Sequence, residues 1–92
     1  MIQRMNKYIT NPTLVEHLDL LAGSLALDEQ FREHFKRNRL NAINWYNTEF
    51  APRYRQRQIL LTDSEKKLVN ALTAKSVDEF IELIAVITMA GN

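Results

Sequence analysis

Hydrophobic positions recur at helical spacing in the stretch "NPTLVEHLDLLAGSLAL". Its leucines at 14, 18, 21 and 25 follow the i, i+4, i+7, i+11 spacing of one helical face. Asn11 is a suitable N-cap, and Pro12 at the first helical position loses no hydrogen bond. Gly23 costs up to about 1 kcal/mol relative to alanine, or lets a neighbouring helix approach closely. The pattern predicts a helix over 12–27.

A second helical pattern predicts a helix over 28–50. Asp28 is a good N-cap, and the acidic residues precede the basic ones, as the helix dipole favours. Asn38 interrupts its apolar face, which consists of Phe31, Phe35, Ala42 and Tyr46. Pro52 ends or kinks this helix, because the residue before a proline avoids the helical region. Residues 48–60 then read equally as a short extended segment or as a continuing helix.

Two capping boxes mark the starts of two further helices. "TDSE" at 62–65 and "SVDE" at 76–79 each place a glutamate three residues after the capping hydroxyl. They predict helices over 62–74 and 76–88, and so an all-α, compact four-helix domain of short helices around a single core. The predicted core consists of Leu14, Leu18, Leu21, Phe31, Phe35, Leu68, Leu72, Phe80, Ile81 and Ile84.

Composition agrees with one helical domain. The chain has 92 residues, is 46% hydrophobic and 25% charged, and contains only two glycines and two prolines, too few for the many turns of an all-β fold. The absence of cysteine excludes a disulfide framework and a zinc–thiolate site. The first ten residues lack the apolar core of a signal peptide, and no apolar run reaches the roughly 18 residues of a membrane span. We therefore expect a cytoplasmic protein without a membrane anchor.

The formal net charge of +1 is unevenly distributed. Residues 31–60 carry seven basic against two acidic residues, whereas residues 1–30 carry two against four and residues 61–92 three against five. The basic residues of this middle third form the candidate partner-binding set, Arg32, Lys36, Arg37, Arg39, Arg53, Arg55 and Arg57. Interleaved with Trp45, Tyr46 and Tyr54, they could contact phosphates and stack on bases. A sequence pI of about 8.1 and the lack of a helix-turn-helix pattern favour an acidic protein partner or a solvated face instead.

The sequence offers little for catalysis. His17 and His34 fall on different predicted helices, and neither belongs to an H-x-x-x-H or E-x-x-H pattern, so we expect no metal site. No nucleophile motif or glycine-rich phosphate loop is present. We expect no active site contained in this chain alone and no cofactor of its own.

The C-terminal stretch "IELIAVITMAGN" is the most apolar part of the chain. From Leu83 the predicted helix is apolar nearly all round, and such a helix is normally covered by something. Val86, Ile87 and Thr88 are β-branched and also favour extended structure. The tail is therefore a core helix, a seam between two copies of the chain, or a strand in the groove of a partner.

The order of motifs resembles a known family. "LALDEQFREHFKRNRLNAINWY" followed by "LTDSEKKLVNALTAKSVDEFIELI" is similar to the small subunit of two-subunit extradiol dioxygenases over residues 14–46 and 61–84. The same fold resembles the helical leader domains of split borosin precursors, which are ribosomally made, post-translationally modified peptides. "TEFAPRYRQRQI" has no counterpart in the family, and "AKS" replaces its usual acidic position.

The resemblance implies a precursor peptide with two parts. Residues 1–84 would be a leader that docks on a modifying enzyme, and residues 85–92 would be the core peptide. The partner enzyme would use S-adenosylmethionine to N-methylate backbone amides, with Val86, Ile87 and Thr88 as the candidate acceptors. The alternative is a helical accessory subunit or adaptor of an enzyme complex, and the third interpretation is an arginine-rich nucleic-acid binder.

Overall fold

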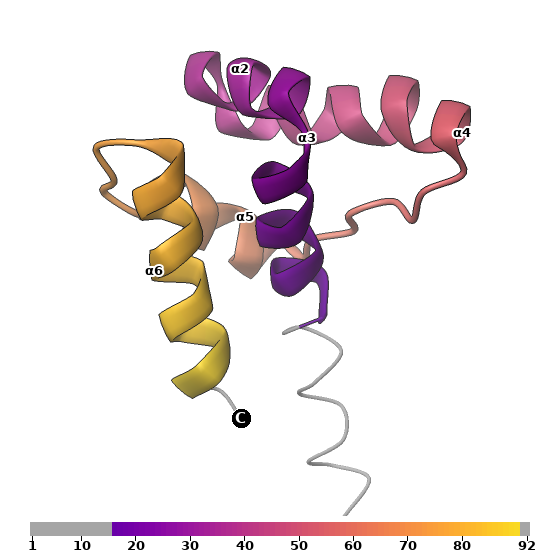
Figure 1. Cartoon of the computed structure of the whole chain (residues 1–92). Helices are drawn as coiled ribbons and strands as arrows, with labels where there is room; N and C mark the ends of the chain where they lie inside the picture. The colour runs from indigo at the N-terminus through magenta and orange to yellow at the C-terminus, as the bar shows by residue number, and fades with distance from the viewer. Residues whose placement is uncertain (1–15, 91–92) are drawn as a thin grey trace, which may run out of the picture.

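The computed structural model describes residues 16–90, with side chains described to residue 89, and this part of the chain is helical without a strand. It confirms the predicted all-α class. The helices are residues 16–27, α2 (Glu29–Arg37), α3 (Arg39–Trp45), the π-helix η1 (Tyr46–Phe50), α4 (Ala51–Tyr54), α5 (Asp63–Ala71) and α6 (Val77–Ala90). In Figure 1, α2, α3 and α4 form an upper layer, and helix 16–27 and α6 run downward from it. No helix in the described part of the chain is long and apolar enough to cross a membrane.

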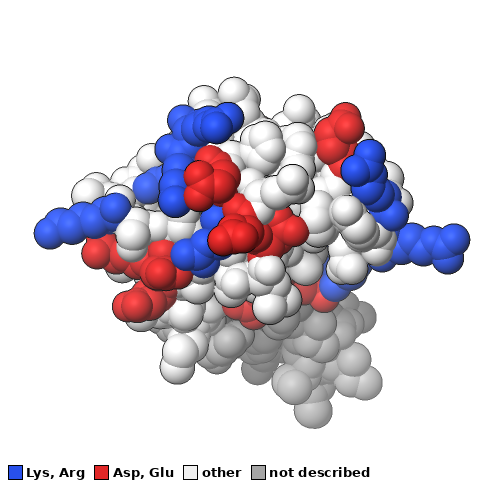
Figure 2. Space-filling view, turned by 45° about the horizontal axis from the view of Figure 1, so that its top comes forward, with Lys and Arg blue, Asp and Glu red and all other residues white. Residues whose placement is uncertain are grey.

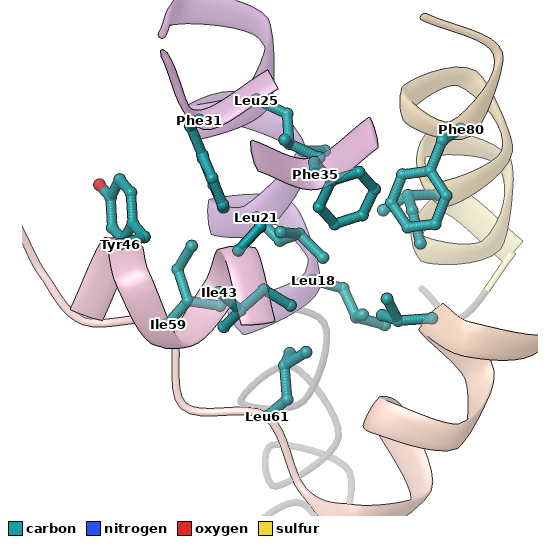
Figure 3. Packing of buried hydrophobic residues seen from close by; sticks show 14 of the residues in the cluster. Leu18, Leu21, Leu25, Phe31, Phe35, Ile43, Tyr46, Ile59, Leu61 and Phe80 are labelled. Atoms are coloured by element: carbon teal, nitrogen blue, oxygen red, sulfur yellow. The ribbon is translucent and has the colours of Figure 1, made fainter. Parts of the chain in front are cut away.

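A single buried cluster joins the helices, and Figure 3 shows its centre. Six of the predicted core residues are buried, namely Leu18, Leu21, Phe31, Phe35, Phe80 and Ile84. Leu68, Leu72 and Ile81 are half-buried and pack against this cluster, and Leu14 lies outside the described residues. Gly23 is exposed, and among the described residues no atom lies within 4 Å of the position that a Cβ would take, so of its two alternatives the close approach of a helix is not found.

The predicted single helix over 28–50 is wrong, because the chain breaks at Asn38. Asp28 caps α2 as expected, accepting a 2.7 Å hydrogen bond from the Phe31 amide. Asn38 is extended, with φ −159° and ψ 115°, and its side chain accepts a 3.0 Å hydrogen bond from the Asn41 amide. The residue that interrupts the apolar face thus ends α2 and caps α3, because a short amide side chain competes well for free backbone donors.

The helix does not end at Pro52, because α4 continues through it to Tyr54. It widens into η1 one turn earlier, where the Ala51 amide donates to the Tyr46 carbonyl five residues back. A proline lacks an N–H, and its ring presses on the carbonyl four residues before it, so a wider turn relieves the contact. The helix ends at Tyr54. Arg55 adopts the left-handed conformation, and the Gln56 amide closes the end with a 2.8 Å hydrogen bond to the Ala51 carbonyl.

Residues 56–62 are irregular and cross back over the helices. Asn47 holds this segment with two hydrogen bonds: its Oδ1 accepts from the Ile59 amide at 2.7 Å, and its Nδ2 donates to the Ile59 carbonyl at 2.9 Å. His17 Nδ1 accepts a further hydrogen bond from the Leu60 amide. Ile59 and Leu61 are buried as a result, although neither was a predicted core residue. Of the two conformations expected for residues 48–60, the continuing helix is found as far as Tyr54, and the chain is irregular from Gln56 onward.

The capping boxes differ in detail. Thr62 and Glu65 form both reciprocal hydrogen bonds, as predicted. Ser76 accepts from the Glu79 amide, but the Glu79 carboxylate accepts from the Lys75 amide and not from the cap. The helix that Thr62 caps ends at Ala71, three residues earlier than expected, whereas α6 continues to Ala90, two residues further than expected.

Candidate functional site

α6 has one face in the core and one face in solvent. Its buried side chains are Val77, Phe80, Ile84 and Thr88. The outer face starts with exposed acidic residues and ends with Ala85, Val86 and Met89, of which Val86 is 63% and Met89 75% exposed. The helix thus offers apolar side chains to solvent over its last two turns while its other side holds the fold together.

The three candidate acceptor residues lie inside α6. Val86 is exposed, Ile87 is half-buried, and Thr88 is only 4% exposed. The Thr88 hydroxyl donates to the Ala85 carbonyl at 3.1 Å, a bond within the helix. Residues 85–90 are helical, not extended, so their backbone amides are engaged in helical hydrogen bonding.

The seven candidate partner-binding residues fall into two groups. Arg32, Lys36, Arg37 and Arg39 lie on α2 and at the start of α3, whereas Arg53, Arg55 and Arg57 lie at the far end of α4. Between them along the chain lie the rest of α3 and the π-helix η1. Figure 2 shows the upper layer turned toward the viewer, with basic side chains toward both ends of the molecule and acidic side chains between them.

Two of these basic side chains hold the fold together. Arg39 donates to the Val69 carbonyl at 2.7 Å and the Leu72 carbonyl at 2.6 Å, and its guanidinium lies 4.9 Å from the centre of the Phe80 ring. These carbonyls are at the end of α5, where the helix has no donors of its own. Arg32 forms a 2.8 Å ion pair with Asp78 and so joins α2 to α6.

Two exposed ion pairs involve other members of the set. Arg57 pairs with Glu16 at 3.2 Å, and this contact lowers the pKa of Glu16 and raises that of Arg57. Lys36 pairs with Glu33 at 2.9 Å and lowers the pKa of that carboxyl. Because these side chains are exposed, salt screens both pairs and they contribute little to stability.

A hollow lies on the upper layer between α2 and the η1–α4 turn. It has a volume of about 240 Å³ and is lined by Gln30, His34, Trp45, Glu49, Phe50, Arg53 and Tyr54. Its rings touch in series: His34 stacks on Trp45 at 4.1 Å between centroids, Trp45 lies 6.0 Å from Phe50, and Phe50 lies 4.6 Å from Tyr54. We call this hollow the aromatic groove.

The aromatic groove was not predicted from the sequence. In a regular α-helix, residues five apart point about 140° away from each other, so Trp45 and Phe50 would not meet. The π turn closes over five residues and brings both rings to one side. Of the three aromatic residues expected to stack on bases, Tyr54 is 55% exposed and Trp45 half-buried, but Tyr46 is buried and its hydroxyl accepts from Ser24.

The two histidines make contacts with different parts of the molecule. His17 accepts from the Leu60 amide, and His34 stacks on Trp45. Within residues 16–89, no three histidine or carboxylate side chains form a group that could hold a metal ion.

No family model, curated protein or solved structure matches this chain. The fold and the surfaces define a small all-helical domain with two distinctive exposed features, the apolar outer face of α6 and the aromatic groove. Apolar patches and clusters of Trp, Tyr and Arg are, in proteins generally, enriched where proteins meet.

Proposed function

We propose that this chain is a non-catalytic helical docking protein, an accessory subunit or adaptor that binds a larger protein through the outer face of α6. The observation that carries this proposal is the exposure of Val86 and Met89 on a helix whose opposite face is in the core. A helix of this kind binds by laying its apolar face into a groove of the partner.

The energetics favour such an interaction. Burying a large apolar side chain gains about 1.5–3 kcal/mol when it starts from full exposure, and Val86 and Met89 retain most of their exposed surface. The helix is already ordered by its inner face, so docking would not require the entropy cost of folding it. The exposed acidic residues Asp78 and Glu82 at the other end of the same face add a charged margin to the apolar patch.

A precursor peptide is the second candidate, because the side chains of residues 83–92 are uncharged and Val86 is exposed. The helical part would then dock on an enzyme that methylates the amides of Val86, Ile87 or Thr88 with S-adenosylmethionine. Such an enzyme needs an extended substrate, so α6 would have to unwind from about Ala85. The burial of Thr88 opposes that step and supports the adaptor over the precursor.

Two substitutions on the outer face test the adaptor. Val86→Asp and Met89→Glu should leave the thermal unfolding midpoint nearly unchanged, because both side chains point to solvent. Each should abolish co-purification with the proteins encoded by the genomic neighbours, since a charge would be buried at the contact. Leu27→Glu is the matched control, because Leu27 is an equally apolar side chain that is 90% exposed elsewhere on the molecule. Retained binding by both α6 variants would contradict the proposal.

The intact mass of the chain after the same co-expression separates the two candidates. The adaptor predicts an unchanged mass. Methyl additions that map to Val86, Ile87 or Thr88 would instead establish the precursor.

A further inference from the structure

The aromatic groove has walls from two parts of the chain. Gln30 and His34 come from α2, and the other lining residues come from α3, η1 and α4. The break at Asn38 turns α3 back along α2, so that the His34 ring meets the face of Trp45. The π turn adds Phe50 on the other side of Trp45. The sequence pattern predicts one continuous helix over 28–50. The groove forms because this stretch instead has a break at Asn38 and a π turn.

Polar groups converge on the groove without partners. The side chains of Gln30, Glu49 and Arg53 make no hydrogen bond or ion pair with another residue in the range 16–89. Neither the Trp45 indole N–H nor the Tyr54 hydroxyl bonds to another residue of that range. A concave site that combines aromatic walls with several free polar groups is suited to hold a ligand in a defined orientation.

Its size points to a single side chain. The volume of about 240 Å³ lies below the roughly 300–1,000 Å³ of small-molecule and cofactor pockets. One bulky residue presented by a partner is a better match. Trp, Tyr and Arg, the residue types that most often dominate protein interfaces, are all present in the lining.

The charges around the groove define what should flank that residue. Arg53 lines the groove, and Arg55, which is exposed, directly follows Tyr54. Neither arginine pairs with a carboxylate elsewhere in residues 16–89. Arg55 also adopts the left-handed conformation with φ 55°, which glycine occupies at lower cost.

We propose that the aromatic groove binds a bulky apolar or aromatic side chain presented by an acidic segment of the partner protein, with Arg53 and Arg55 contacting the flanking carboxylates. This inference rests on the proposed docking function and adds a second, separate contact to the outer face of α6.

A nucleic-acid strand fits the same surface less well. Only two arginines that form no ion pair within residues 16–89 flank the groove, whereas a nucleic-acid strand is held by a row of cations along its phosphates. Tyr46 is buried and provides no stacking face. A protein segment requires neither a continuous basic track nor a row of stacking rings.

Selection from a displayed library of random peptides tests the proposal with the full chain as bait. A variant carrying Arg53→Glu and Tyr54→Ala serves for counter-selection, because both side chains are exposed. Trp45 is the sole tryptophan of the chain and lies in the groove, so its fluorescence reports binding of enriched peptides that lack tryptophan. Arg37→Glu is the matched control, an exposed charge reversal at the other end of the layer.

The expected peptides combine aspartate or glutamate with one Phe, Leu, Ile or Met. They should change Trp45 emission saturably, and Arg53→Glu and Tyr54→Ala should each weaken binding by about tenfold or more, whereas Arg37→Glu should not. Equal binding by peptides whose single Phe, Leu, Ile or Met is replaced by alanine would overturn the proposal. So would enrichment that the double variant retains, the absence of enriched peptides, or preferential quenching of Trp45 by oligothymidine or oligouridine. The outcome of this selection does not affect the co-purification test of the α6 variants. The docking function proposed for α6 is therefore judged separately from the aromatic groove.

Discussion

Arg39 has a structural role that its place in a basic run conceals. Its guanidinium provides two hydrogen bonds to the last carbonyls of α5 and lies over the Phe80 ring, which packs in the core. The planar fork of an arginine can reach two carbonyls at once, and a lysine ammonium acts as a single point charge. By contrast, Arg37 lies two residues earlier and is exposed.

Replacing Arg39 by lysine should therefore destabilise the fold. Hydrogen bonds from charged groups are worth about 1.5–3 kcal/mol, and we expect Arg39→Lys to lose one of its two carbonyl contacts and the stacking on Phe80. The free energy of unfolding from urea titration should fall by about 2 kcal/mol. Arg37→Lys should change it by less than about 0.5 kcal/mol. Equal values for the two variants would show that Arg39 does not cap α5.

Arg55 allows the opposite test. Arg55 is in the left-handed region, where a non-glycine residue costs about 1–2 kcal/mol. Glycine removes this cost, but it loses more conformational entropy on folding, which offsets part of the gain. Arg55→Gly should therefore raise the free energy of unfolding by about 0.5–1 kcal/mol, measured by urea titration. The same substitution should weaken binding of acidic peptides to the aromatic groove. A loss of stability would mean that the Arg55 side chain makes contacts that hold the fold.

At the scale of elements, the sequence predicts helix starts better than helix ends. Capping residues are local signals, so Asp28 and Thr62 were found at their positions. The sequence shows Asn38 as an interruption of the apolar face but does not show that the helix breaks there. Only the extended backbone angles of Asn38 distinguish a break from a polar residue within a continuous helix. The π turn depends on Pro52 and on packing around Phe50, so no periodicity reveals it. The aromatic groove was missed for that reason.

The two caps of the C-terminal helices should differ in strength. Thr62→Ala removes one half of a complete capping box, and we expect a loss of about 1–1.5 kcal/mol in the free energy of unfolding. Ser76→Ala should cost about 0.5–1 kcal/mol, because Glu79 already satisfies the Lys75 amide independently of the serine hydroxyl. Thermal unfolding of both variants measures the difference, and a larger loss for Ser76→Ala would reverse this order.

At the scale of the whole molecule, the inner face of α6 belongs to the same buried cluster as α2 and helix 16–27. The sequence placed Phe80 and Ile84 in the core correctly. It did not decide whether the later residues pack in the core or are presented to a partner, because apolar residues are equally suited to both. The half-burial of Ile87 and the burial of Thr88 favour packing, whereas Val86 and Met89 face solvent.

Deleting residues 86–92 should destabilise the domain. The truncation removes the packed side chains of Ile87 and Thr88 and the last helical turn that follows Ile84, and we expect a loss of about 2 kcal/mol or more. A small domain has only about 5–15 kcal/mol in total, so the unfolding midpoint should fall by several degrees. The double variant Val86→Asp, Met89→Glu keeps the helix length and is the control. An unchanged midpoint after truncation would show that the tail is dispensable for folding.

Hydrogen–deuterium exchange across α6 tests most directly whether its end is a docking helix. In the isolated chain, the amides of residues 86–89 should be protected to a similar degree as those of residues 81–84, because one helix contains both. Added partner should increase protection of 86–89 while the mass of the chain stays unchanged. Exchange of residues 86–89 at the rate of an unfolded chain, with the rest of the domain protected, would contradict the docking helix and favour a presented peptide.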